Sequence, residues 1–259
     1  MMKFSTDELD AAKDFLRRRI ESELSMARDV ESLLGEYAER LLVLLFRDAA
    51  QDEINALIDE LIAQLIEDCY ILGVDDRQDE REAILLWMNS ERHGDTLEGR
   101  IGSRARTFFN EVFAVYMAGR LLGLGEKVLL SSIKASWKHP WDNFVLTSVR
   151  EKIATGAVAG DLADFEEPHY GPGTEISSFG ALQTLTGYAI ADAWMWWQHE
   201  DKRREGMRGF YVLRGSSYPC DICQAVVDAG FHDMGDIDAI PPFHNHCCCY
   251  VVYSEVERV

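Results

Sequence analysis

The clearest pattern of apolar and polar positions lies in INALIDELIAQLI, residues 54–66. Apolar side chains recur there every three or four residues, at Ile54, Leu57, Ile58, Leu61, Ile62, Leu65 and Ile66. Because an α-helix turns once in about 3.6 residues, this spacing gathers them on one face. The segment therefore predicts an amphipathic helix whose apolar stripe packs against another element.

Similar stripes lie on both sides of this helix. The earlier one contains Phe15 or Leu16, Ile20, Leu24, Ala27 and Leu34. We expect Gly35 to interrupt it before the next helix. The later one, SRARTFFNEVFAVYMAGRLLG, should stop at Gly123 and Gly125, because glycine commonly follows a helix end. The charged residues 75–82 predict a linker or a helix start, and the first two-thirds of the chain is expected to be helical.

The strongest break in the pattern is DFEEPHYGPGTEISS, residues 164–178, which has two prolines, two glycines and no apolar period. A further helix should follow, with Trp194, Trp196 and Trp197 in the core or in a subunit contact. Beyond Gly206, FYVLRG and CYVVYSEV predict strands.

These patterns predict a mainly α protein. We expect a helical body over residues 1–165, a linker over 166–178 and a small α+β domain over 179–259. The last fifty or so residues hold too little apolar mass to be stable alone, so a covalent or metal staple is expected there.

The charge of the chain restricts its partners. The 26 basic and 45 acidic side chains give a net charge of −19, which repels a nucleic-acid backbone. The segment KRREGMR, residues 202–208, is interleaved with acidic residues, and we interpret it as a solvated helix end rather than a DNA-contacting strip. The charged N-terminus has no signal-peptide core and the longest apolar run, LLVLLF, cannot span a bilayer, so a cytosolic protein with reduced thiols is expected.

Cysteines and histidines gather near the C-terminus. Cys220-x-x-Cys223 is followed, after twenty residues, by His244-x-x-Cys247 in the segment PPFHNHCCCYVV. Two short-spaced pairs of this kind are what a tetrahedral zinc site needs. The sequence therefore predicts zinc bound by Cys220, Cys223, His244 and Cys247, with metal-free thiols as the alternative.

The last of these ligands stays open on the sequence alone. If residues 247–251 are extended, Cys247 and Cys249 face one side and either can reach the metal, whereas Cys248 faces away. His246 can replace His244, although His244 has the better spacing. Cys69 falls on a helix beside the apolar stripe and is expected to be a buried thiol.

Two enzyme hypotheses arise from the same residues. The adjacent letters HNH do not indicate a nuclease, because in HNH nucleases these residues come from separate elements around one metal. PCDIC matches half of the zinc deaminase signature, with His199 and Asp201 as an imperfect second half, and a zinc-dependent deaminase-type hydrolase is the alternative function. No other catalytic motif is found, so we expect no enzyme activity.

The order helix, strand, C-x-x-C, spacer, PPFHNHCCC and final strand resembles the C-terminal domain of the Mu F-like minor head proteins of tailed bacteriophages, over residues 175–255. The family's closing pattern, His, two residues, Cys, one residue, Cys, falls on His244, Cys247 and Cys249. This chain departs from it with Cys248 where an arginine is usual and His246 where an asparagine is usual.

The resemblance implies a virion structural protein that acts in head assembly and, in some phages, leaves the head with the DNA. The implied partners are the portal protein, the major capsid protein or both, with multiple copies per virion, possible contact with packaged DNA and no membrane. The implied location is the capsid interior or portal vertex, and the host cytoplasm during assembly.

Overall fold

The computed structural model describes residues 4–90, 95–137, 153–155, 177–216 and 219–257. Its α-helices are α1 (Thr6–Phe46), α2 (Gln51–Val74), α3 (Arg81–Met88), α4 (Leu97–Leu121), α5 (Glu126–Ser136), α7 (Ser178–Arg204) and α8 (Asp221–Ala229). Its other elements are the 3₁₀ helices η1 (Gln78–Glu80) and η3 (Ile237–Ala239) and the strands β1 (Gly209–Leu213), β2 (Phe231–Asp233) and β3 (Tyr250–Ser254). The expected mainly α fold with a small C-terminal sheet is confirmed.

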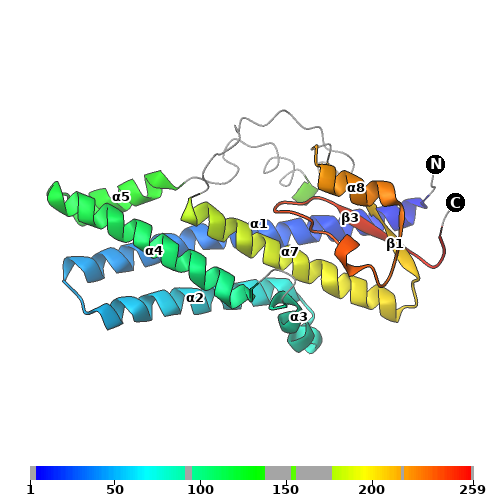
Figure 1. Ribbon diagram of the computed structural model, residues 1–259, viewed down its shortest axis with the longest axis horizontal. Coiled ribbons are helices and arrows are strands. Elements are labelled where there is room, and N and C mark those ends of the chain that lie inside the picture. The colour runs from blue at the N-terminus through cyan, green and yellow to red at the C-terminus, as the bar shows by residue number, and fades with distance from the viewer. Residues whose placement is uncertain (1–3, 91–94, 138–152, 156–176, 217–218, 258–259) are drawn as a thin grey trace.

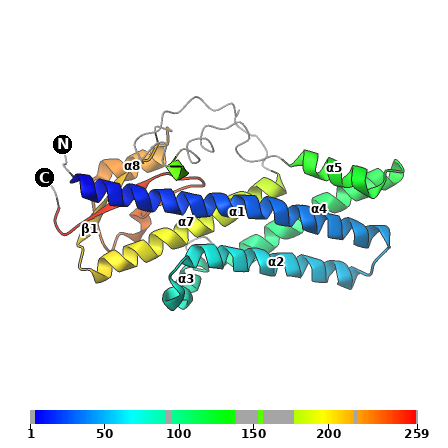
Figure 2. The same ribbon diagram turned by 180° about the vertical axis from the view of Figure 1, so that it is seen from behind.

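The long helices α1, α2, α4 and α7 run lengthwise through the molecule and pack against one another (Figure 1). Helix α5 lies at one end of this bundle, and the sheet with α8 lies at the other, as the reverse view also shows (Figure 2). None of the described helices combines the length and apolar character needed to cross a bilayer.

Helix α1 is longer than the sequence predicts. It begins with a capping box, in which the Ser5 hydroxyl accepts from the Glu8 amide and the Glu8 carboxylate accepts from the Ser5 amide. The expected break at Gly35 is wrong, because the helix continues through this residue to Phe46. Gly35 is buried beside Lys134 and Trp137 at the C-terminal end of α5, so tertiary packing outweighs the weak helix propensity of glycine.

The stripe of α2 forms part of the main core. Leu57, Leu61 and Leu65 are buried, and the four isoleucines of the stripe are partly buried and pack around the same cluster. Cys69 continues the stripe and is fully buried, which confirms the buried thiol expected there. Helix α2 contacts α1, α4 and α7, so the stripe is satisfied within the chain.

The predicted helix boundaries in the middle of the chain are largely confirmed. Helix α4 ends at Leu121, and Gly123 follows with a φ of 69°, a conformation that glycine adopts without strain. The charged residues 75–82 contain η1 and the first turn of α3. Residues 164–176 of the predicted interdomain boundary lie outside the described residues.

Helix α7 is the most deeply buried element of the bundle. Trp194 and Trp197 are 2% and 6% exposed and both meet the ring of Phe15 edge-on, as the expectation of core tryptophans requires. Trp196 is half-buried and stacks on Trp87. We assigned this helix to the C-terminal domain, yet it packs against α1, α2 and α4. The domain division itself stays a prediction.

The sheet is antiparallel, with β1 between β2 and β3. Both strands expected from the sequence, β1 and β3, are present, whereas β2 and α8 were not expected. A separate cluster joins α1 to the segment of β3 through Ala12, Leu16, Ile20, Cys248, Tyr250 and Val252, with Ile153. The C-terminal unit therefore uses α1 as part of its core, in agreement with its small apolar mass.

We predict that Leu61→Ala lowers the free energy of unfolding by about 2–5 kcal/mol, because the side chain is fully buried in the main core and its removal leaves a cavity. Chemical denaturation followed by circular dichroism measures this value. Leu86→Ala is the matched control, because Leu86 is 77% exposed and its truncation should change stability by less than about 0.5 kcal/mol. Equal effects of the two substitutions would contradict the packing described here.

Candidate metal centre

The first cysteine pair lies at the start of α8. Cys220 is the N-cap residue, and its sulfur accepts from the Cys223 amide at 3.5 Å. Cys223 lies one turn further along, where it is 3% exposed. The helical turn thus places both sulfurs on the same side of α8.

The second group of ligand candidates lies on the segment that leads into β3. The Tyr188 hydroxyl of α7 donates to the Pro242 carbonyl at 3.1 Å and holds the start of this segment. His244 has its Nδ1 2.8 Å from the Asn245 carbonyl. An N–H at Nδ1 is needed for that bond, so Nε2 keeps its lone pair and is the nitrogen available to a metal.

The two groups meet around Cys223. His244 Nε2 lies 3.1 Å from Cys223 Sγ, and Cys247 Sγ lies 3.9 Å from the same sulfur. In a tetrahedral zinc site, two sulfurs are about 3.8 Å apart, and a sulfur and a nitrogen about 3.6 Å. The observed spacings are close to those that a shared metal ion requires.

Five residues form this cluster, in two overlapping groups of three. Cys220, Cys223 and His244 form one group, Cys223, Cys247 and Cys249 form the other, and within each the ligand atoms lie within 4.8 Å of one another. The predicted ligands are therefore gathered at one place but are divided between the groups, with Cys223 common to both. Cys249 joins as the alternative ligand that the sequence left open. The cluster could hold a metal ion, and which four residues would bind it stays a prediction.

Cys248 differs from its neighbours, as the alternation along an extended chain predicts. It belongs to the cluster of apolar side chains on α1, together with Leu16 and Ile20. Neither group of three includes Cys248 or His246 among the described residues. His246 has a φ of 61°, and it lines the small cavity beside the cluster with Cys248.

The pKa values of the buried thiols are shifted in opposite directions. Burial by itself would raise the pKa of Cys247, but hydrogen bonds from the Cys223 and Cys249 thiols hold that pKa well below the usual cysteine range. The pKa of Cys223 is raised chiefly by its hydrogen bond to Cys247. The cluster therefore favours one thiolate at Cys247, which is the protonation state that a metal ligand needs.

His199, the histidine that the deaminase hypothesis would use, does not belong to the cysteine cluster. Its Nε2 donates to the Met234 carbonyl at 2.9 Å, and its ring packs against Phe210 and Tyr253. Among the described residues, no candidate metal group contains His199. Asp201, which would take the role of the deaminase acid, is paired with Arg77. The geometry gives the deaminase hypothesis no support at these positions.

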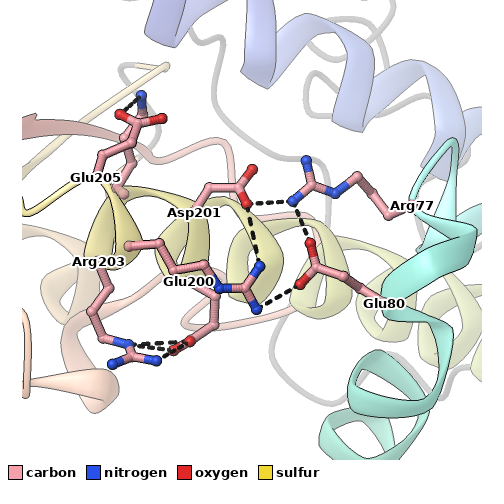
Figure 3. Close-up of polar contacts among 8 residues, drawn as sticks. Arg77, Glu80, Glu200, Asp201, Arg203 and Glu205 are labelled. Atoms are coloured by element: carbon pink, nitrogen blue, oxygen red, sulfur yellow. Dashed lines mark hydrogen bonds and ion pairs between the residues drawn. The ribbon is translucent and has the colours of Figure 1, made fainter.

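The basic segment after His199 is largely neutralised (Figure 3). Arg204 pairs with Glu80 at 2.9 Å, and Arg77 bridges Glu80 and Asp201, which ties η1 to the end of α7. The remaining pairs are Arg203 with Glu200 at 2.7 Å and Lys202 with Glu205 at 2.6 Å. The cations of residues 202–204 are therefore engaged with carboxylates, as expected for a solvated helix end.

Sequence reasoning missed two residues that reach the centre from α1. Arg19 and Glu23 are 0% and 3% exposed, and Arg19 Nε lies 3.1 Å from Glu23 Oε1. The Arg19 guanidinium also donates to the Cys247 carbonyl at 2.5 Å. The available signal was a charged pair four residues apart within the apolar stripe of α1. Such pairs usually lie on solvated faces, so the pattern alone did not indicate burial.

Comparisons with known protein families, with curated proteins and with solved structures found no match for this chain. The resemblance to the Mu F-like minor head proteins therefore stays a hypothesis that rests on the motif.

We predict a pH dependence of stability that arises from His199. Burial lowers the pKa of His199 below its ordinary value of 6.5, so the folded state favours the neutral ring that donates to Met234. The stability that depends on this group is complete above pH 6.5 and is lost as the pH falls through the folded-state pKa.

Denaturation midpoints between pH 7.5 and about 5 measure this effect in the wild type and in His199→Gln. The wild type should lose more stability on acidification than the variant, which has no group to protonate. Because both proteins keep the same cysteine cluster, their difference isolates His199. Parallel pH curves for the two proteins would contradict the assignment.

Proposed function

We propose that the cluster binds one zinc ion per chain through Cys220, Cys223, His244 and Cys247. Thiolate and imidazole are the ligands that zinc prefers in structural sites, and one neutral imidazole with three thiolates fits a closed tetrahedral shell. The tautomer of His244 and the lowered pKa of Cys247 support this set. If one of these four residues does not bind the metal, Cys249 is the residue that would take its place.

We propose further that the zinc is structural. The cavity that remains beside the cluster has a volume of about 10 Å³, close to the space for a single water molecule. A deaminase would need room there for a nucleoside and an open coordination position for water. The tightly filled cluster, in which Cys223, Cys247 and Cys249 are buried, is the observation that carries a structural role for the centre and for the chain.

The role that this site supports best is that of a minor head protein of a tailed phage, associated with the portal or the capsid interior. Three features support it: the order of Cys and His residues, the mainly helical body and the acidic surface, which does not suit a DNA-coating protein. The resemblance adds a role in head assembly, and a role in DNA ejection where the protein leaves the head with the genome.

The surface of the helical body that suits a protein partner lies on the C-terminal part of α4 and on the turn that follows. Phe113, Met117 and Leu121 recur every four residues along one helical face and are 47%, 49% and 88% exposed. Leu122 and Val128 extend this exposed apolar surface toward α5. We propose that portal or capsid protein contacts it, because contiguous exposed apolar surface commonly marks an interaction site.

We predict that Cys223→Ser abolishes zinc binding and exposes the C-terminal segment to protease, because a structural zinc contributes on the order of 10 kcal/mol of binding free energy. Metal analysis and limited proteolysis of the purified full chain measure both effects. Cys248→Ala is the matched control and should keep both the metal and the protection, since this thiol packs on α1.

The fourth ligand is decided by comparing Cys247→Ala with Cys249→Ala, of which only the first should lose zinc. Equal zinc content in wild type and Cys223→Ser, or no zinc in the wild type, would contradict the proposed centre. Acidification should also release the metal, because protons compete with it for the thiolates and for His244.

For the head role, we predict that the chain is present in purified DNA-filled particles of the phage that encodes it. A deletion of its gene, complemented in the host by plasmid copies, allows variants to be compared. The double variant Phe113→Asp and Met117→Asp should be excluded from particles, because charge on this face opposes an apolar contact. Mass spectrometry of gradient-purified particles measures incorporation.

Leu86→Asp is the control for this experiment, since Leu86 is 77% exposed on α3, away from that face. It should be incorporated as the wild type is. Absence of the wild-type chain from particles, with normal head yield after gene deletion, would refute the proposed function.

A further inference from the structure

A fully buried arginine joins the first helix to the cysteine segment. Arg19 of α1 is 0% exposed, although arginine is almost never completely buried unless it is paired. Its Nη2 donates to the Cys247 carbonyl at 2.5 Å and its Nη1 to the Cys249 carbonyl at 3.4 Å. One planar guanidinium thus holds two peptide groups of the segment that carries the ligand candidates.

Glu23 forms an ion pair with this guanidinium. Its Oε1 lies 3.1 Å from Arg19 Nε, one turn along the same helix, and its side chain is 3% exposed. The carboxylate balances the charge of the arginine, so the pair brings little net charge to the cluster. Its effect on Cys247 and Cys249 is therefore mainly geometric, since the rigid fork of donors fits two carbonyls at once.

Apolar packing positions the same segment from α1. Leu16 and Ile20, which flank Arg19 on the buried side of the helix, belong to one cluster with Cys248 and Tyr250. Gly215 completes the contact, because a Cβ there would lie 2.2 Å from the Cys248 carbonyl oxygen and 3.0 Å from Leu16. The segment is thus held between α1 and the residues that follow β1.

We propose that Arg19 is a positioning residue of the metal centre. It holds the backbone at Cys247 and Cys249 so that their sulfurs, on the opposite side of the segment from α1, face Cys223. The metal centre then takes its support from both ends of the chain, and metal binding and the docking of α1 on this segment reinforce one another. This inference rests on the metal binding proposed above. It adds Arg19, which lies 228 positions before Cys247 in the sequence, to the residues that support the centre.

The test replaces the pair as a unit. In the full chain, Arg19→Met with Glu23→Met removes the donors to both carbonyls without leaving an unpaired buried charge. Arg19→Lys keeps the charge but has no planar fork for two carbonyls. Arg17→Met is the control, because Arg17 lies on the exposed side of the same helix with Asp14 and Glu21.

Zinc affinity is measured by competition with a chelator, and the ligand geometry by the absorption spectrum of the Co²⁺-substituted protein. The double variant should bind zinc about 10- to 100-fold more weakly and show altered cobalt bands, while its helices melt cooperatively. Arg19→Lys should lie between it and the wild type, and Arg17→Met should match the wild type. A merely structural role would change the melting temperature and leave the cobalt spectrum unchanged.

A folded double variant with wild-type zinc affinity and cobalt spectrum would overturn the role of Arg19 while leaving the metal centre intact. Absence of zinc from the wild type would overturn the centre itself, and this inference with it. If the double variant does not fold, hydrogen exchange of the wild type decides the question. Metal removal should then raise exchange at residues 12–24 of α1 and not at residues 34–45, and unchanged exchange in both would overturn the proposal.

Discussion

One face of α1, between Ala12 and Glu23, supports the whole C-terminal unit. A three-stranded sheet with strands of three to five residues cannot bury a core of its own. It gains the missing apolar contact from α1, whose side chains share a cluster with Cys248, Tyr250 and Val252. The sheet and the segment of the cysteine cluster therefore both depend on packing against the first helix.

The buried ion pair on that face carries a desolvation penalty that apolar side chains in its place would avoid. Taking Arg19 and Glu23 out of water carries a desolvation penalty that their attraction only partly offsets, and an apolar pair of similar volume is often as stable. The carbonyls of Cys247 and Cys249, however, lie in a segment where both residues are buried, and buried carbonyls need donors. On the role proposed for Arg19, the pair serves to position the segment rather than to add stability.

Much of this fold could be predicted from the sequence, because its helices carry regular stripes such as Leu57, Leu61 and Leu65 and strands β1 and β3 carry apolar runs. The cysteine and histidine pairs could be predicted from their spacing, since a short loop brings both members to one point. Helix α8 and strand β2 were missed, because the twenty-residue spacer between the pairs gave no period long enough to distinguish them.

Two other features could not be predicted because they depend on contacts between distant segments. Gly35 continues α1 only because α5 packs beside it, and Arg19 is buried only because a segment 228 residues later supplies its acceptors. The division of the ligands into two groups that share Cys223 has the same origin. Spacing determines which residues can meet, whereas the supporting helix determines how they are oriented.

The two ends of the molecule differ in chemistry, and this difference bears on the proposed function. The sheet end holds the cysteine cluster and the buried ion pair of α1. The opposite end is formed by the C-terminal part of α4 and by α5 (Figure 1). Apolar side chains such as Phe113 and Leu121 are exposed there. A partner that binds at this end can engage apolar surface without disturbing the metal centre. On the proposed function, the centre keeps one end of a long bundle rigid while the other end makes the contacts of assembly.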